Sequence, residues 1–159
     1  MAPTRRLLGL AGWILLCLGV AAVSGLATVE GTRTWYPTIA KPSWTPPSWL
    51  FGPVWTALYV AMGVAAWRVW RIGGFRAART ALGLFLAQLA VNGLWSPIFF
   101  AWHRLGLAVL DIGLLWLLIV ATIVAFRRHD RVAALLLLPY LAWVTFASAL
   151  TVAIWRLNG

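Results

Sequence analysis

The sequence is poor in the residues on which most enzymes rely for catalysis. Its 159 residues include three acidic residues, two histidines and one cysteine. A single cysteine excludes an intrachain disulfide and a cysteine-pair metal site. So few acids and histidines leave general acid–base chemistry little to work with. A glycine-rich phosphate loop and an HExxH motif are also absent. The composition therefore favours a binding protein over a familiar enzyme, and we expect no catalytic residues, no metal and no obligatory cofactor.

Charged residues of either sign are scarce. They make up 10% of the chain, against about 25% in a typical soluble domain. Hydrophobic residues make up 63%, and the mean hydropathy is +0.89. The apolar runs are continuous rather than alternating, which indicates helices and excludes a membrane β-barrel. The composition therefore predicts an integral membrane protein.

Five apolar runs follow one another along the chain. We expect helices at about residues 7–29, 49–70, 79–102, 105–126 and 132–155. The predicted fold class is an all-α integral membrane protein, a five-transmembrane-helix bundle, with residues 1–159 forming one domain. A long aromatic and proline-rich loop, residues 30–48, would join the first two helices. The first run, of roughly 20 apolar residues, exceeds the usual 7–15 of a signal peptide, so we interpret it as a retained helix.

The formal charge of +10 results from thirteen Lys and Arg against three Asp and Glu. In a soluble protein this balance would suggest nucleic acid, but here the basic residues cluster at the ends of apolar runs. We therefore expect no nucleic-acid partner. Most of the arginines fall on the side of the N-terminus, which the positive-inside rule places in the cytoplasm. The first loop would then lie on the opposite side of a multi-pass protein.

The stretch from Trp35 to Tyr59 is unusually aromatic and proline-rich. It reads WYPTIAKPSWTPPSWLFGPVWTALY and contains four tryptophans and five prolines. Proline fixes φ and lacks a backbone donor, so the first part should be stiff and extended. Aromatic rings on a stiff backbone suit a surface that covers a flat apolar ligand. The alternative is a loop whose tryptophans only sit at the depth of the lipid headgroups.

Helical periodicity predicts inward faces on three of the helices. Polar amides at membrane depth rarely face lipid, so Gln88 and Asn92 should point into the bundle. Ordinary packing between helices would also account for the aromatic members. Pro97 should loosen the third helix and free a carbonyl near Gly93. The three faces are Trp55, Tyr59, Met62 and Ala66; Gln88, Asn92, Trp95 and Phe99; and Tyr140, Trp143, Ala147 and Leu150 or Thr151.

Three further features allow two interpretations each. Asp111 is the only acid within an apolar run, which indicates either a functional site or a satisfied acid near a helix start. His103 is expected to be a solvated residue rather than a metal or haem ligand. Gly83, Ala87 and Ala90 form a small-residue stripe, which could serve a dimer or packing within one subunit.

The blocks WYPTIAKPSWTPPSWLFGPVWTALY, QLAVNGLWSPIFF and LPYLAWVTFASAL followed by WRLN closely resemble the translocator protein family. This family is also called TspO, the tryptophan-rich sensory proteins or the peripheral-type benzodiazepine receptors. The resemblance spans all five predicted helices. It implies a five-helix bundle, commonly a homodimer, that binds porphyrins such as protoporphyrin IX and haem, sterols, and synthetic isoquinoline or benzodiazepine ligands. The pocket would lie between the helices, closed by the first loop.

The resemblance also implies the binding residues. They would be Tyr36, Pro46, Trp55, Tyr59, Asn92, Trp95, Trp143, Ala147 and Leu150. Porphyrin propionates would reach Arg33 or Lys41 at the mouth. The chain departs from the family's sterol-recognition pattern, since Val152 stands where that pattern needs tyrosine. This departure weakens the expectation of sterol binding and favours a bacterial, porphyrin-linked member in the cell membrane.

Three functions remain open on these grounds. The leading hypothesis is a membrane receptor or sensor that modulates tetrapyrrole transport or metabolism. The alternatives are a catalyst of light- and oxygen-dependent porphyrin degradation, and a carrier of porphyrin or sterol across the membrane.

Overall fold

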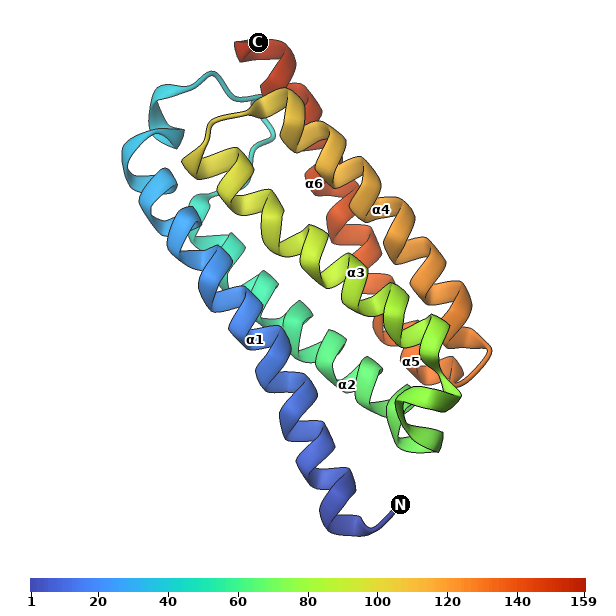
Figure 1. Ribbon diagram of the computed structural model, residues 1–159. Coiled ribbons are helices and arrows are strands. Elements are labelled where there is room, and N and C mark those ends of the chain that lie inside the picture. Colours follow the sequence, from blue (N-terminus) through green and yellow to red (C-terminus); the bar gives the residue numbers. More distant parts are fainter.

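The computed structural model describes residues 1–159, which form helices joined by short connections and contain no strand (Figure 1). Five helical stretches are long and apolar enough to cross a membrane. This confirms the predicted all-α membrane bundle. The helices are α1 (Pro3–Thr34), α2 (Phe51–Ala77), α3 (Arg79–Ser96), α4 (Leu105–Arg127), α5 (Arg131–Leu136) and α6 (Leu138–Asn158), with short 3₁₀ turns η1 (Tyr36–Thr38) and η2 (Ser48–Leu50) and a π-helical turn η3 (Pro97–Ala101).

Three helices differ clearly from the expected bounds. α2 runs to Ala77 rather than to residue 70, with non-helical backbone angles at Gly73 and Gly74. α1 continues to Thr34, because no proline stands between Pro3, in its first turn, and Pro37. The first loop is therefore residues 35–50 rather than 30–48. The expected fifth helix is interrupted at Leu137, between α5 and α6. Pro139 lies in the first turn of α6, where its missing N–H costs nothing, so the break precedes it.

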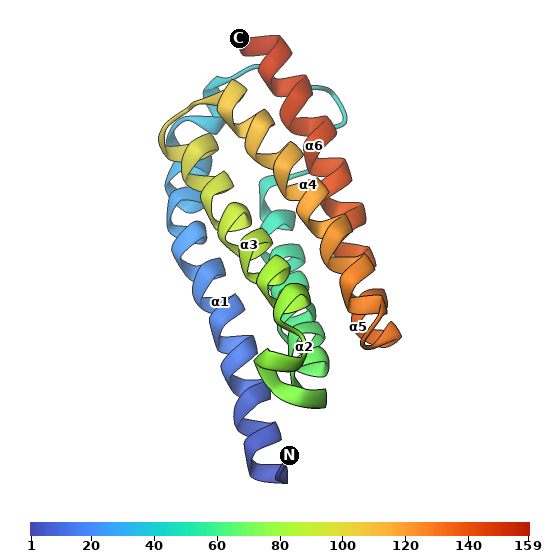
Figure 2. The ribbon, with the colours of Figure 1, turned by 45° about the vertical axis from the view of Figure 1, so that its right-hand side comes forward.

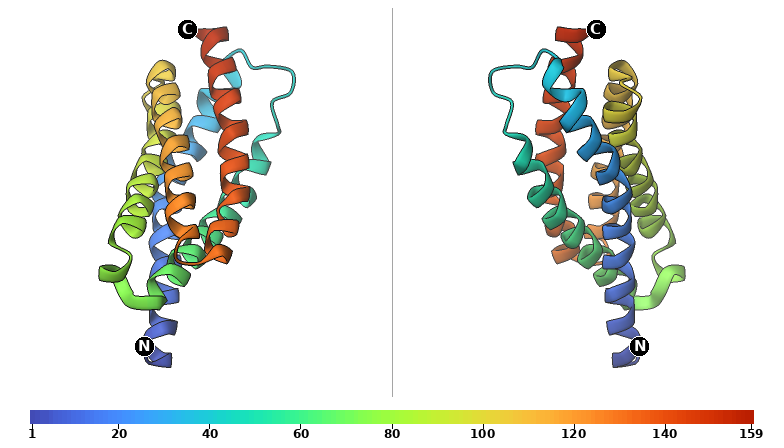
Figure 3. Two further views of the ribbon diagram at one scale, coloured as in Figure 1. Left: turned by 90° about the vertical axis from the view of Figure 1, so that its right-hand side faces the viewer. Right: turned by 90° about the vertical axis from the view of Figure 1, so that its left-hand side faces the viewer.

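The helices are arranged so that the first loop and the C-terminus lie at one end of the bundle (Figure 2). α1 packs against α2 and α3, α3 packs against α4, and α4 packs against α6. The N-terminal turns of α1 project beyond the other helices at the opposite end (Figure 3). α1 and α2 approach closely at Gly63, where an added Cβ would lie 2.7 Å from the Cα of Ile14. Glycine at this position therefore lets the two backbones meet.

A small cluster of buried residues, among them Tyr36 and Phe99, packs beside the first loop. The main core occupies the half of the bundle nearer the N-terminus. Its large buried side chains include Met62, Phe85 and Phe126, and the two phenylalanine rings stack with centroids 5.8 Å apart. Tight packing in this half fixes the helices, whereas the half below the first loop is more open. The predicted site residues lie toward this open half.

Pro97 ends the regular α-helical hydrogen bonding of α3, as predicted. Proline lacks the N–H that would bond the carbonyl of Gly93, four residues earlier, and the chain forms a π-helical turn from Pro97 to Ala101. The Ser24 hydroxyl of α1 donates to this carbonyl over 3.0 Å. The expectation of a freed carbonyl near Gly93 is thus confirmed, and α1 supplies its partner.

The small-residue stripe on α3 does not pack within the subunit. Ala87 and Ala90 are exposed, and a Cβ added at Gly83 would meet no atom within 4 Å. Of the two interpretations, packing within one subunit is therefore wrong. A homodimer contact through this stripe stays a prediction.

Candidate ligand-binding pocket

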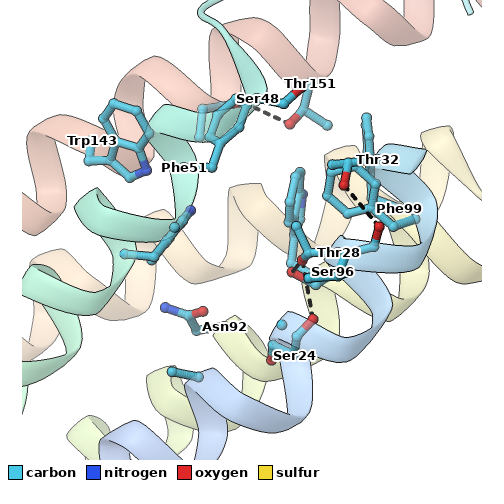
Figure 4. Close-up of a pocket in the computed structure, with 18 of the residues that line it drawn as sticks. Ser24, Thr28, Thr32, Ser48, Phe51, Asn92, Ser96, Phe99, Trp143 and Thr151 are labelled. Atoms are coloured by element: carbon cyan, nitrogen blue, oxygen red, sulfur yellow. Dashed lines mark hydrogen bonds between the residues drawn. The ribbon is translucent and has the colours of Figure 1, made fainter. Parts of the chain in front are cut away.

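A cavity of about 390 Å³ lies between the helices, directly below the first loop (Figure 4). Small-molecule pockets usually occupy about 300–1,000 Å³. α1, α2, α3, η3, α4 and α6 all contribute to its lining, together with Tyr36, Ser48 and Trp49 of the first loop. Several lining residues of α1 and of the start of α2 are exposed, among them Val29, Gly52 and Thr56. The pocket therefore opens sideways between these two helices.

Most of the sequence-predicted site residues line this pocket. They are Tyr36, Trp55, Tyr59, Asn92, Trp95, Trp143, Ala147 and Leu150. Pro46 does not line it, which contradicts its predicted place in the site. The middle of the loop instead passes over α6, where Trp44 packs edge-on against Phe146 with centroids 5.8 Å apart. Ser48 and Trp49 take the place expected for Pro46.

Aromatic rings form two opposite walls of the pocket. On one side, Trp95 stacks on Phe99 with centroids 4.9 Å apart and planes 17° apart. On the other, Phe51 packs edge-on against Trp143 at 6.0 Å (Figure 4). The indole nitrogens of Trp95 and Trp143 are buried and have no hydrogen-bond partner. The walls thus hold flat apolar surface and two donors that nothing in the protein satisfies.

The deep end of the pocket rests on a chain of hydrogen bonds between three helices, the Tyr–Asn network. Tyr59 donates to the Oδ1 of Asn92 over 2.7 Å, and the Nδ2 of Asn92 donates to the hydroxyl of Tyr140. Tyr140 donates to the Oε1 of Gln88 over 2.8 Å. All four side chains are buried. The predicted inward orientation of Gln88 and Asn92 is confirmed, and Tyr59 and Tyr140 are their partners.

Hydroxyl groups on α1 supply a polar side that the sequence reading missed. Ser24, Thr28 and Thr32 line the pocket one turn apart, and Ser96 lines it from α3. Thr28 donates to the Oγ of Ser96 over 3.1 Å. The sequence contains a signal for this polar face, since Ser24, Thr28 and Thr32 recur every four residues in a largely apolar run. This side could offer hydrogen bonds to polar groups of a ligand.

The first loop is attached to the bundle at several points. The N–H of Ala40 donates to the Oδ1 of Asn158 over 2.9 Å, and the Nδ2 of Asn158 donates to the carbonyl of Ala40 over 2.8 Å. The Nζ of Lys41 donates to the carbonyls of Tyr36 and Ile39 at 2.7 and 3.0 Å. The attachments close the loop over one side of the pocket. Sequence reasoning missed Asn158, for which the only signal was its place in the WRLN block.

A second attachment lies on the other side of the loop. The ring of Trp35 stacks on that of His103 with centroids 4.2 Å apart and planes 17° apart. His103 has φ of 53°, the left-handed conformation, which is uncommon outside glycine. The residue is exposed, as expected, but its backbone is bent so that the imidazole meets the loop. His103 therefore fixes the start of the loop to the α3–α4 connection.

Two further titratable groups, Tyr36 and Asp111, differ in their relation to the pocket. Burial raises the pKa of the Tyr36 phenol above its usual value, so the ring that faces the pocket stays neutral. Asp111 does not line the pocket, and its Oδ2 is buried without a hydrogen-bond partner. This oxygen contradicts the interpretation of Asp111 as a satisfied acid near a helix start.

The fold and the pocket together define a class of protein. It is a multi-pass membrane protein with five spanning helices, an aromatic pocket of ligand size at one end, and a loop between the first two spans that covers this pocket.

Comparison with known proteins identifies the family. The sequence profile of the TspO/MBR family matches residues 13–156. The chain is 45% identical to the translocator protein of Homo sapiens over 143 residues, which cover 89% of this chain and 84% of that protein. It is 43% identical to the tryptophan-rich protein TspO of Chlorobaculum tepidum over 155 residues, or 97% and 98% of the two chains. Protein CrtK of Rhodobacter capsulatus is 45% identical over 139 residues, or 87% of each chain. The chain belongs to the TspO/MBR family.

Proposed function

We propose that this protein is a membrane receptor that binds porphyrins, protoporphyrin IX and haem among them, in the pocket below the first loop, and so modulates tetrapyrrole transport or metabolism. The observation that carries the proposal is the pair of aromatic walls, Trp95 on Phe99 and Phe51 against Trp143. A planar macrocycle gains most from offset or edge contact with such rings. A porphyrin is a ligand, and the protein needs no obligatory cofactor.

The propionates of the porphyrin would meet a cation at the mouth. Lys41 already directs its ammonium at the carbonyls of Tyr36 and Ile39, and it lies 4.8 Å from the ring centroid of Tyr36. Arg33 is exposed next to the lining residue Thr32 and has no acidic partner. Of the two cations that the sequence suggested, Arg33 is therefore the one free to bind a carboxylate.

The experiment is a titration of purified protein with protoporphyrin IX, haem and cholesterol in parallel, followed by quenching of tryptophan fluorescence. We expect saturable quenching by both porphyrins and a weaker response to cholesterol, because Val152 breaks the sterol pattern. Trp55→Phe and Trp143→Phe should reduce porphyrin quenching. Trp102→Phe is the matched control, because Trp102 is 58% exposed and lies outside the pocket. Unchanged quenching in both pocket variants would overturn the proposal.

Two variants test separately the free space in the pocket at Ala147 and the positive charge of Arg33. Ala147→Phe should fill the pocket and weaken porphyrin binding more than tenfold, whereas Ala142→Phe adds the same ring to an exposed position of α6. Arg33→Gln should weaken binding of the free acid of protoporphyrin IX but not of its dimethyl ester. Equal effects of Arg33→Gln on acid and ester would exclude the proposed ion pair.

One observation favours a second candidate function, light- and oxygen-dependent porphyrin degradation. Four tryptophans line the pocket, Trp49, Trp55, Trp95 and Trp143, and would lie beside a bound macrocycle that sensitises oxygen. Illumination of the complex in air should then bleach the porphyrin, at a rate that falls in Trp55→Phe and Trp143→Phe but not in Trp102→Phe. Bleaching at the same rate in all variants would exclude a role for the protein.

The proposal extends to further ligands of the pocket, to the oligomeric state and to the orientation in the membrane. The same pocket would accept isoquinoline- or benzodiazepine-type synthetic ligands. The protein would act as a homodimer in the bacterial cell membrane, with its N-terminus in the cytoplasm and the first loop on the opposite side. The distribution of arginines supports this orientation.

A further inference from the structure

A shallow groove lies on the outer surface of the bundle, at the end opposite the first loop. Gly9, Gly12, Trp13, Leu16 and Trp70 line it, and its volume is about 300 Å³. It belongs to the N-terminal half of α1 and the last turns of α2, and it shares no residue with the ligand pocket. The residues that line it are apolar.

Two glycines make this groove. The six-membered ring of Trp70 lies directly against Gly9, where any Cβ would overlap it. At Gly12 an added Cβ would meet no atom within 4 Å, so the groove is open there. Trp13 closes the inner side, since it packs edge-on against the buried Phe85 at 5.8 Å. The result is a shallow apolar groove on the surface of α1 beside Trp70.

Arginines surround the outer end of the groove. The guanidinium of Arg5 lies 5.9 Å from the ring centroid of Trp70, and that of Arg71 lies 5.0 Å from the ring centroid of Trp67. The indole N–H of Trp67 donates to the carbonyl of Arg6 over 2.8 Å, which ties the start of α1 to α2. The two guanidiniums are thus held over indoles three residues apart on one helix. Their positions are fixed by packing rather than left to the solvent.

Arg5 and Arg6 form no salt bridge, and Arg71 forms only a long one. Both salt bridges of the structure involve Asp130, which lies 3.0 Å from Arg68 and 4.0 Å from Arg71. The other acids are Glu30 and Asp111, on or near the far half of the molecule. Arg5 and Arg6 therefore present uncompensated positive charge beside an apolar channel. That combination matches a molecule with an anionic head and a hydrocarbon tail.

We propose that this groove is a binding site for an anionic glycerophospholipid. One acyl chain lies along Gly12 and Leu16 between the rings of Trp13 and Trp70, and the phosphate lies between Arg5 and Arg71. Tryptophan and arginine at the end of an apolar run place the site at headgroup depth. The bilayer supplies the occupant, so no soluble partner is needed.

Native mass spectrometry of the purified full chain in a neutral detergent tests the site. The probes are dioleoyl phosphatidylglycerol and dioleoyl phosphatidylcholine, which differ only in the headgroup. We expect at least one retained phosphatidylglycerol and weaker retention of phosphatidylcholine. Arg5→Gln and Arg71→Gln should each reduce phosphatidylglycerol affinity about fivefold. Arg156→Gln, at the other end of the bundle, should have no effect, because Arg156 is exposed in the last turn of α6.

A second pair of variants tests the acyl channel. Gly12→Leu should block it and reduce retention of both lipids, whereas Gly19→Leu places the same side chain on an open surface of the same helix. Equal retention in these two variants, or equal retention of the two lipids by the unmodified protein, would overturn the proposal. Glycerol 3-phosphate at millimolar concentration should not displace the lipid. Displacement would show an anion site without a chain channel and would likewise overturn it.

Discussion

Asn158 holds both backbone polar groups of Ala40, a residue 118 positions earlier, by two hydrogen bonds of 2.9 and 2.8 Å. The amide side chain acts like a short piece of neighbouring backbone: its oxygen accepts from the N–H and its nitrogen donates to the carbonyl. The end of α6 thereby fastens the middle of the first loop. The loop's position over the pocket depends on this contact.

Asn158→Ala should loosen the first loop without unfolding the bundle. Each lost hydrogen bond contributes about 0.5–1.5 kcal/mol, so opening of the loop should become roughly tenfold more frequent. Hydrogen exchange at the amide of Thr45 measures this, because its hydrogen bond to the carbonyl of Pro42 lies within the loop and does not involve Asn158. Porphyrin release should speed up by a similar factor. Leu157→Ala is the control, because Leu157 is 54% exposed and forms no part of the Asn158–Ala40 contact. Unchanged exchange at Thr45 would show that the loop is held elsewhere.

Tyr140→Phe should destabilise the bundle more than Tyr59→Phe does. Loss of the Tyr140 hydroxyl leaves the Nδ2 of Asn92 without an acceptor and the Oε1 of Gln88 without a donor, whereas loss of the Tyr59 hydroxyl leaves one group unpaired. At about 0.6–1.7 kcal/mol for a hydrogen bond between membrane helices, we expect about 1–3 kcal/mol for Tyr140→Phe.

Thermal unfolding in detergent measures both losses in the Tyr–Asn network. Tyr36→Phe, which removes a hydroxyl outside that network, should change the midpoint little. Equally small decreases of the unfolding midpoint in Tyr140→Phe and Tyr59→Phe would show that the Tyr–Asn network does not stabilise the bundle.

The sequence predicted the helices and their inward faces because these follow from periodicity and from the cost of exposing amides to lipid. It placed Gln88, Asn92 and Trp95 correctly on one face of α3, and Trp55 and Tyr59 on one face of α2. It did not reveal that Asn92 joins Tyr59 to Tyr140, because pairing between helices depends on rotation and depth rather than on local pattern.

Asp130 should stabilise the end of the bundle where the N-terminus lies. Burial tends to raise the pKa of its carboxyl, but the N–H of Ala133 and the guanidinium of Arg68 outweigh that effect and lower the pKa below its usual value. A lowered pKa means that the stabilisation is complete above the unfolded value of about 3.9. It is lost as the pH falls through the folded pKa, which lies below about pH 4.

Substitutions at Asp130 separate its charge from its role as a helix cap. Asp130→Asn should cost about 2 kcal/mol at pH 7 and remove this part of the acid dependence, because an amide still caps α5 but cannot pair with Arg68. Asp130→Ala should cost about 1 kcal/mol more. Unfolding midpoints between pH 3 and pH 7 provide the comparison, and identical pH profiles for Asp130→Asn and the unmodified protein would contradict this account.

Gly63→Ala should be disproportionately destabilising for the addition of one methyl group. Its Cβ would lie 2.7 Å from the Cα and 3.0 Å from the N of Ile14, and backbone atoms cannot move aside as a side chain can. Overpacking of this kind costs about 1–3 kcal/mol. Gly19→Ala is the matched variant, because its Cβ would meet nothing within 4 Å and alanine favours helix by up to about 1 kcal/mol. Equal unfolding midpoints for the two variants would exclude close contact between α1 and α2.

The path of the first loop was the least predictable part of the site. Proline content indicated a stiff segment, which is correct in outline, but not which side of the pocket it crosses. That path depends on distant partners: Asn158 for Ala40, Phe146 for Trp44, and His103 for Trp35. Pro46 was misplaced for this reason, since a resemblance between blocks of sequence does not specify the course of the chain between its anchors.

The contact between Ala40 and Asn158 also determines when, during biosynthesis, the first loop can be fixed over the pocket. The ribosome makes the loop 118 residues before the side chain that fastens it. At roughly 5–20 residues per second, the loop waits on the order of ten seconds while the later helices enter the membrane. During that interval the pocket has neither its α6 wall nor a secured cover. A covered pocket is therefore a property that the nascent chain acquires only after α6 has been made.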